Sequence, residues 1–361
     1  MLARTRVLAF ILLLGGPPGA AAKLVPASHP YIQYYGRWDL TDSLHPRFSW
    51  PGVYIRAEFT GKWTGIRLID RTNYYNVYID GRLRRVFHGE APGEAEYVLA
   101  DSLENGQHAL LLSRRNITFD EAYTFCGFVI DDSARILPPA AMPERKMEFI
   151  GDSFTAAESN EATVQELPWE ARIPVTNIDK GFAAIIARHF GAQYQTICRS
   201  GSGMLCDWQG NRAMSIPKRF DRVLMDSEEP KWDFRRWLPD VAVVCLGLND
   251  YSGLKEKDGS VSPENSALFR DTYHAFLSTL RTVSPGVRIV CVSPPNEWIR
   301  SNVYTVVEEE RSSGQGGVFY AQFDRFETGY VANGHPTVAT HQKIAEEIIA
   351  SVDTLPLFPL R

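Results

Sequence analysis

The segment Met147-Glu148-Phe149-Ile150-Gly151-Asp152-Ser153-Phe154 is an apolar run that ends in Gly-Asp-Ser. A run that stops on a small residue followed by a hydroxyl is typical of a parallel strand with a nucleophile at its carboxyl end, where open α/β sheets place their chemistry. Taken alone, the three residues Gly151 to Ser153 also fit a turn or a helix N-cap. Residues further along the chain favour the first interpretation.

Three more short blocks follow, each just past a segment with strand character. They are Ser200-Gly201-Ser202-Gly203, Gly247-Leu248-Asn249-Asp250 and Gly334-His335-Pro336. Ester hydrolysis needs a nucleophile, donors for the developing oxyanion, and a base that accepts the nucleophile's proton. We therefore expect Ser153 as the nucleophile and His335 as the base. The expected oxyanion donors are the backbone N–H groups of Ser153 and Gly201 and the side-chain amide of Asn249. The carboxylates Asp152 and Asp250 are expected to bond nearby backbone N–H groups.

From residue 147 to residue 361 the chain alternates apolar strands with helices. Nearly unbroken apolar strands indicate a parallel sheet with helices on both faces, and five strands in a flavodoxin-like order give the simplest topology. The expected strands are 147–150, 193–198, 241–246, 288–292 and 318–322, and the expected helices are 180–189, 264–282 and 338–352.

Residues 23–135 have a different pattern, in which short strands are separated by turn residues. Apolar residues alternate with polar ones around residues 53–59, and Asp80-Gly81 is a tight hairpin signal. This pattern predicts an antiparallel β-sandwich. Its aromatic residues are expected to fill the core, with a sugar-binding face as the alternative. Residues 136–146 contain three prolines and are predicted to be the linker between the two domains.

Residues 1–22 have the order of a secretory signal peptide: positive charge, a short apolar run, then small residues. They predict a secreted or periplasmic protein with no membrane association after cleavage. The net charge is −5 and the chain carries no basic surface signal for nucleic acid. Cys198 and Cys206 are close enough in sequence for a local disulfide. Asn116-Ile117-Thr118 would be a glycosylation site only in a eukaryotic secretory pathway. His189 and His341 lie in no metal-ligand spacing, so neither a metal nor another cofactor is expected.

The four blocks, in this order, resemble the SGNH or GDSL hydrolase superfamily. The β-sandwich ahead of them, the histidine pair at His335 and His341 and the run Thr340-His341-Gln342-Lys343-Ile344-Ala345 resemble carbohydrate esterase family 2. This resemblance implies an N-terminal jelly roll and an acetylesterase without a metal. It also implies an acetylated polysaccharide substrate, acetyl-xylan or acetyl-glucomannan.

The sequence departs from the superfamily pattern just before the histidine. An acid usually stands two or three residues ahead of it, and here those positions hold Asn333 and Ala332. An amide can orient an imidazole but carries no charge, and an Asp-to-Asn change costs about 10⁴ in rate in the serine-protease triad. Members of the resembled family work as a Ser–His dyad with the imidazole held by a backbone carbonyl. We therefore expect a dyad in which Asn333 or a backbone oxygen orients His335.

Three tryptophans in the predicted loops are candidates for stacking on a sugar ring. They are Trp208, Trp169 and Trp298, with Trp208 first because it follows the Gly201 block directly. Core packing or loop anchoring is the competing interpretation for each. Two other functions stay open. A lipase or lysophospholipase on the same scaffold would need an apolar acyl groove, and a carbohydrate-binding protein with an inactive site would fit the missing acid.

Overall fold

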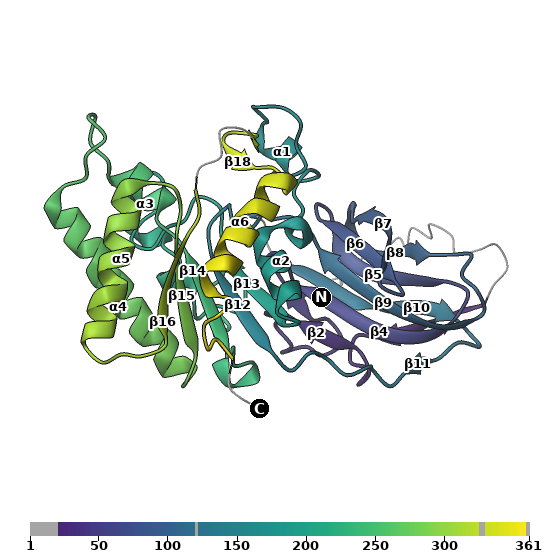
Figure 1. Cartoon of the computed structure of the whole chain (residues 1–361). Coiled ribbons are helices and arrows are strands. Elements are labelled where there is room, and N and C mark those ends of the chain that lie inside the picture. The colour runs from purple at the N-terminus through teal and green to yellow at the C-terminus, as the bar shows by residue number, and fades with distance from the viewer. Residues whose placement is uncertain (1–20, 120–121, 325–328, 359–361) are drawn as a thin grey trace, which may run out of the picture.

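The computed structural model of the 361-residue chain describes residues 21–119, 122–324 and 329–358. An antiparallel sandwich is followed by a parallel sheet with helices around it (Figure 1). The fold class predicted from the sequence is therefore confirmed. The expected signal peptide lies outside the described residues except for Ala21 and Ala22, and Ala22 already belongs to the first strand.

Two antiparallel sheets form the sandwich. The first has the order β1 (Ala22–Pro26), β10 (Tyr123–Asp131), β5 (Thr64–Asp70), β8 (Ala91–Ala100), with β3 (Arg47–Phe48) also paired to β10. The second has the order β11 (Ile136–Leu137), β4 (Tyr54–Gly61), β9 (Gly106–Arg114), β6 (Tyr74–Ile79), β7 (Arg82–His88), with β2 (Gln33–Tyr35) beside β4. The Asp80-Gly81 hairpin joins β6 to β7, and both residues have the positive φ that its turn requires. β11 extends the sandwich into the segment predicted to be the linker.

The parallel sheet has the order β13 (Gln193–Cys198), β12 (Lys146–Gly151), β14 (Val241–Cys245), β15 (Arg288–Ser293), β16 (Val318–Gln322), which is the predicted flavodoxin-like order. The helices are α1 (Trp169–Arg172), α2 (Phe182–His189), α3 (Leu248–Leu254), α4 (Pro263–Val283), α5 (Glu297–Ser312) and α6 (Val338–Val352). α2 and α6 pack on one face of the sheet, and α4 and α5 on the other. A short hairpin of β17 (Tyr330–Val331) and β18 (His335–Pro336) precedes α6.

The sandwich and the parallel sheet share one hydrophobic core, which continues from the inner faces of the sandwich to β12, α4 and α5. The sandwich tryptophans Trp38 and Trp50 lie in this core, and Trp63 is also buried, as expected for core-filling aromatics. Arg37 of the sandwich forms an ion pair with Glu148 of β12 at 3.4 Å, and both side chains are buried. Burial raises the pKa of Glu148, while the nearby Arg37 charge opposes that shift. The sandwich and the parallel-sheet region are therefore joined by contacts that are buried from solvent.

The structure decides two possibilities that the sequence left open. Cys198 and Cys206 do not form a disulfide, because both are free and buried, as are Cys126, Cys245 and Cys291. Asn116 of the sequon is fully buried: its side-chain oxygen accepts from the Tyr74 N–H at 2.7 Å, and its amide donates to Asn73 at 3.0 Å. A glycan has no space at this position, so the sequon serves the packing of the sandwich.

Candidate active site

The carboxyl ends of β12, β13 and β14 bring three of the four sequence blocks together. In the sheet register, Gly151 lies opposite both Cys198 and Cys245. Ser153, Gly201 and Asn249 come shortly after these three aligned residues. The strand order reverses at β12, so the blocks meet at the position where doubly wound sheets bind their ligands.

The Asn249 side chain links the blocks directly. Its Nδ2 donates to Asp152 Oδ2 at 3.2 Å and to the Ser202 carbonyl oxygen at 3.0 Å. Both amide hydrogens are therefore engaged, and Asn249 has to exchange one of these bonds in order to bind an oxyanion. Within the described ranges, the backbone N–H groups of Ser153 and Gly201 donate to no other group. These two donors are already available for a ligand.

Asp250 fixes the loop that follows Gly201. Its carboxylate accepts the backbone N–H groups of Met204, Leu205 and Cys206 at 2.8, 2.6 and 3.0 Å. Burial raises the pKa of Asp250 to about 6, against the effect of these three hydrogen bonds. The structural role expected for Asp250 is confirmed.

Asp152 fixes the turn that carries the serine. Its Oδ1 accepts the Phe154 N–H at 3.0 Å, and its Oδ2 accepts the Asn249 amide. Burial raises the pKa of Asp152 to about 7, and the neighbouring Asp250 carboxylate adds to this shift. The expected role of Asp152 as a backbone partner is confirmed, and the contact with Asn249 adds a second function that the sequence did not indicate.

His335 reaches the site from the β17–β18 hairpin. Its Nδ1 lies 2.8 Å from the carbonyl oxygen of Ala332. A carbonyl oxygen only accepts, so Nδ1 must carry the hydrogen, and Nε2 of the neutral ring keeps its lone pair. The ring centroid is 6.0 Å from that of Phe154, the residue after the serine, which places the imidazole beside the β12 turn. Among the described residues, no hydrogen bond joins the His335 imidazole to the Ser153 hydroxyl. In apo active sites this catalytic hydrogen bond is often long or poorly aligned and tightens only when the substrate is bound.

Asn333 does not contact the imidazole. Its Oδ1 accepts the Leu167 N–H at 3.4 Å, and its backbone N–H donates to the Gln165 carbonyl at 2.7 Å. Ala332, Asn333 and Gly334 all have positive φ, and this left-handed turn directs the Ala332 carbonyl at the ring. Of the two orienting groups expected from the sequence, the structure therefore places the backbone oxygen at His335.

Glu158 lies next to His335 and is held by Arg172, and neither residue was among the candidates from the sequence. Glu158 Oε1 is 3.8 Å from His335 Nε2 and accepts from Arg172 Nη1 at 2.9 Å. Glu158 is only five positions from Ser153, so its position in the chain was the one available signal. A single acidic residue in a loop is not a specific signal of function, and Glu158 comes close to residue 335 only in the folded chain.

The three candidate tryptophans have different environments. Trp208 is 56% exposed, and its backbone N–H donates to the Gly201 carbonyl at 3.0 Å. The Trp169 ring stacks on Phe119 of the sandwich at 4.6 Å. Trp298 donates to Ser266 and packs against Phe269. Trp208 is thus the exposed ring at the Gly201 block, whereas Trp169 and Trp298 anchor their own segments.

The two other histidines considered from the sequence, His341 and His189, each have a structural partner. His341 is fully buried, accepts the Phe182 N–H at 3.3 Å, and has a pKa lowered to about 3 by burial. His189 pairs with Asp353 at the surface. The described ranges hold no group of three or more His, Cys, Asp or Glu side chains suited to a metal ion. Their helices also include none with both the length and the apolar character to cross a bilayer.

A putative GDSL-like lipase from Bacteroides ovatus has the same fold, with a TM-score of 0.62 at 13% identity over 94% of this chain and 99% of that one. Residues 34–139 match the family model described as carbohydrate esterase 2 N-terminal. Cellulase/esterase CelE of Acetivibrio thermocellus is 30% identical over 333 residues, which cover 90% of this chain and 39% of that protein. An acetylxylan esterase / glucomannan deacetylase of Cellvibrio japonicus is 30% identical over 207 residues, which cover 57% of this chain and 56% of that protein.

Solved structures show the same relationship over nearly the whole chain. A family two carbohydrate esterase from Clostridium thermocellum, in complex with cellohexaose, superimposes with a TM-score of 0.81 at 29% identity. The match covers 91% of this chain and 100% of that one. The protein therefore has the N-terminal domain and the fold of the family two carbohydrate esterases. Its matches span well under two thirds of the length of the two 30%-identical relatives.

Proposed function

We propose that the protein is a serine esterase that removes acetyl groups from an O-acetylated polysaccharide, with xylan and glucomannan as the candidate polymers. The observation that carries this proposal is the meeting of Ser153, two free backbone donors and a carbonyl-held His335 at one edge of the sheet. The names of the relatives, acetylxylan esterase / glucomannan deacetylase and cellulase/esterase, support the substrate class.

In the proposed reaction, Ser153 Oγ attacks the acetyl carbonyl carbon while its proton passes to His335 Nε2. The backbone N–H groups of Ser153 and Gly201 bind the oxyanion. Asn249 joins them by giving up its longer bond, that to Asp152. The tetrahedral intermediate collapses, and the sugar hydroxyl leaves with the proton from His335. Water, deprotonated by the same imidazole, then releases acetate from Ser153.

The substrate side of the proposal rests on Trp208. An exposed indole beside an oxyanion donor offers a flat apolar face on which a pyranose ring can stack while its acetyl group reaches Ser153. Trp208→Ala should therefore raise KM for a polymer more than for a small acetyl ester. A polymeric substrate also fits the secreted or periplasmic location predicted from residues 1–22. N-terminal sequencing of protein recovered outside the cytoplasm would test this location.

The decisive experiment measures acetate released from acetylated xylan and acetylated glucomannan by the wild-type protein and by Ser153→Ala. A decanoyl ester serves as the long-chain comparison. We expect acetate release that the substitution reduces by about 10⁴-fold or more, with little hydrolysis of the decanoyl ester. Preference for the decanoyl ester would instead identify a lipase. Binding of the polymers without any release would identify a carbohydrate-binding protein.

A further inference from the structure

We propose that Glu158 is a positioning residue of the catalytic site: its carboxylate, held by Arg172, faces the His335 imidazole from the Nε2 side and supplies the negative charge that the sequence lacks at positions 332 and 333. The inference rests on the proposed esterase reaction, because it assigns Glu158 a part in the proton transfer from Ser153.

The geometry around Glu158 is closely determined. Its side chain is 3% exposed, Arg172 Nη1 donates to Oε1 at 2.9 Å, and the same oxygen lies 3.8 Å from His335 Nε2. The Glu158 backbone N–H donates to the Ser153 carbonyl at 3.0 Å, so nucleophile and carboxylate belong to one turn. A change in the position of one is therefore transmitted to the other.

The backbone on both sides of Glu158 is strained. Ala157 has a φ of 53° and Ser159 a φ of 57°, the left-handed region that residues with a side chain rarely adopt. Both residues are fully buried. Strain of this kind persists only where the surrounding structure enforces it, and it is concentrated at functional sites. The two left-handed residues direct the Glu158 side chain toward the hairpin that carries His335.

The charge of Glu158 favours one protonation state of the imidazole. Nδ1 donates to Ala332 in every state, so a carboxylate near Nε2 faces a lone pair when the ring is neutral and an N–H when the ring is protonated. The second state exists after Ser153 has given up its proton. Glu158 thus stabilises the charge that develops in the transition state more than the ground state, which is the condition for a rate effect.

Before the reaction, Arg172 reduces the electrostatic effect of Glu158 on the imidazole, because its guanidinium balances the charge of the buried carboxylate. The guanidinium also donates to the Leu167 carbonyl at 2.9 Å, which fixes the position of Arg172 at the end of α1. The other titratable groups near this pair are Asp152 beside the serine and the buried His341 next to His335. Asp152 is tied to Phe154 and Asn249, so it is not aimed at the imidazole.

The test compares Glu158→Gln, which keeps the size and an oxygen for Arg172, with Glu158→Asp, which keeps the charge. Glu166→Gln, an exposed acid on the same loop, is the matched control. On a small soluble acetyl ester we expect Glu158→Gln to lower kcat about 10- to 100-fold with little change in KM. The acidic limb of the kcat/KM profile should move to lower pH, because removing a nearby negative charge weakens proton binding by the imidazole. Glu158→Asp should recover part of kcat.

Two results would overturn the inference. One is a kcat and an acidic limb in Glu158→Gln that equal those of Glu166→Gln. The other is that Glu158→Gln and Glu158→Asp lose kcat and melting temperature equally, while the acidic limb of the kcat/KM profile stays at the wild-type pH. That combination is the result expected for a purely structural residue. An NMR titration of the His335 ring in wild type and Glu158→Gln gives a readout that does not need turnover. If the wild type hydrolyses no acetyl ester, the proposed function fails, while an altered titration would still establish the contact.

Discussion

His335 is held by a main-chain oxygen, and this determines what a substitution at Asn333 should do. The Asn333 side chain faces the Leu167 N–H, away from the imidazole, and its φ of 68° is tolerated by Asn, Asp and Gly. We expect Asn333→Asp and Asn333→Gly to keep kcat within about twofold of wild type. Steady-state kinetics on one acetyl ester check this. A rise in kcat in Asn333→Asp alone would show that a charge at this position does reach His335.

The buried carboxyl of Asp152 predicts a pH dependence of stability. Its folded pKa of about 7 lies above the unfolded value near 3.9, so the folded protein binds more protons in the interval between them. The contribution of Asp152 therefore lowers the free energy of unfolding as the pH rises from about 4 to about 7. Urea unfolding at pH 5 and pH 7.5 should show a larger fall for wild type than for Asp152→Asn. Equal falls would show that Asp152 does not titrate in this range.

At the scale of secondary structure, apolar periodicity was sufficient to predict every strand of the parallel sheet and the helices α2, α4 and α6. The helices α1, α3 and α5 were not predicted, although in α5 the buried residues Ile299, Val303 and Val306 recur at helical spacing. The β17–β18 hairpin was not predicted either, because each of its strands has only two residues and it depends on the left-handed turn at Ala332 to Gly334. Such a turn forms through contacts with residues 164–167, which no local pattern encodes.

The turn after β12 predicts a strong effect of one methyl group. A Cβ on Gly151 would lie 2.0 Å from Thr155 Oγ1 and 2.9 Å from the Cys245 carbonyl oxygen. Because the second atom belongs to the backbone of the neighbouring strand, the turn itself must move. We expect Gly151→Ala to cost about 1–3 kcal/mol of unfolding free energy and to lower kcat about 100-fold through displacement of Ser153.

The matched control for this turn is Gly93→Ala on β8, where a Cβ meets no atom within 4 Å. Urea unfolding and initial rates on an acetyl ester should show little change in that variant. Unaltered kcat in Gly151→Ala would mean that the turn has room to adjust without moving the nucleophile, which the 2.9 Å approach to Cys245 argues against.

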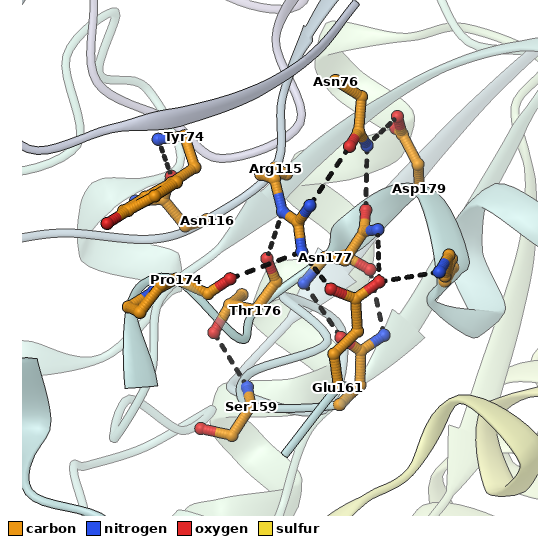
Figure 2. A network of polar contacts seen from close by, with 12 residues as sticks. Tyr74, Asn76, Arg115, Asn116, Ser159, Glu161, Pro174, Thr176, Asn177 and Asp179 are labelled. Carbon is orange, nitrogen blue, oxygen red and sulfur yellow. Dashed lines mark hydrogen bonds and ion pairs between the residues drawn. The ribbon is translucent and has the colours of Figure 1, made fainter. Parts of the chain in front are cut away.

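At the scale of the whole molecule, the site depends on a domain that contributes none of its four sequence blocks. Arg115, the residue directly after the sandwich strand β9, reaches across to residues 159–179, the segment between the Ser153 turn and α2 (Figure 2). Its Nε donates to the Thr176 carbonyl at 3.0 Å, and its guanidinium also pairs with Glu161. Thr176 Oγ1 accepts the Ser159 N–H and donates to the Arg172 carbonyl, both at 2.8 Å. The sequence could not reveal this network, because its partners are distant in the chain.

Removal of the Arg115 guanidinium should therefore weaken both the interface and the site. Arg115→Met leaves the buried Thr176 carbonyl without this donor, and we expect a loss of about 3–5 kcal/mol in unfolding free energy and a lower kcat. Arg115→Lys should be intermediate, because an ammonium cannot make the forked contacts of a guanidinium. Arg82→Met, at an exposed position on β7, is the control.

Urea unfolding of these variants, followed by fluorescence and by residual esterase activity, should give one cooperative transition, because one hydrophobic core includes both the interior of the sandwich and one face of the parallel sheet. Both signals should shift to lower urea together in Arg115→Met. Two separated transitions, with activity retained after the first, would show that the sandwich unfolds independently of the catalytic domain. In that case the interface network, although buried, would not hold the active-site segment in place.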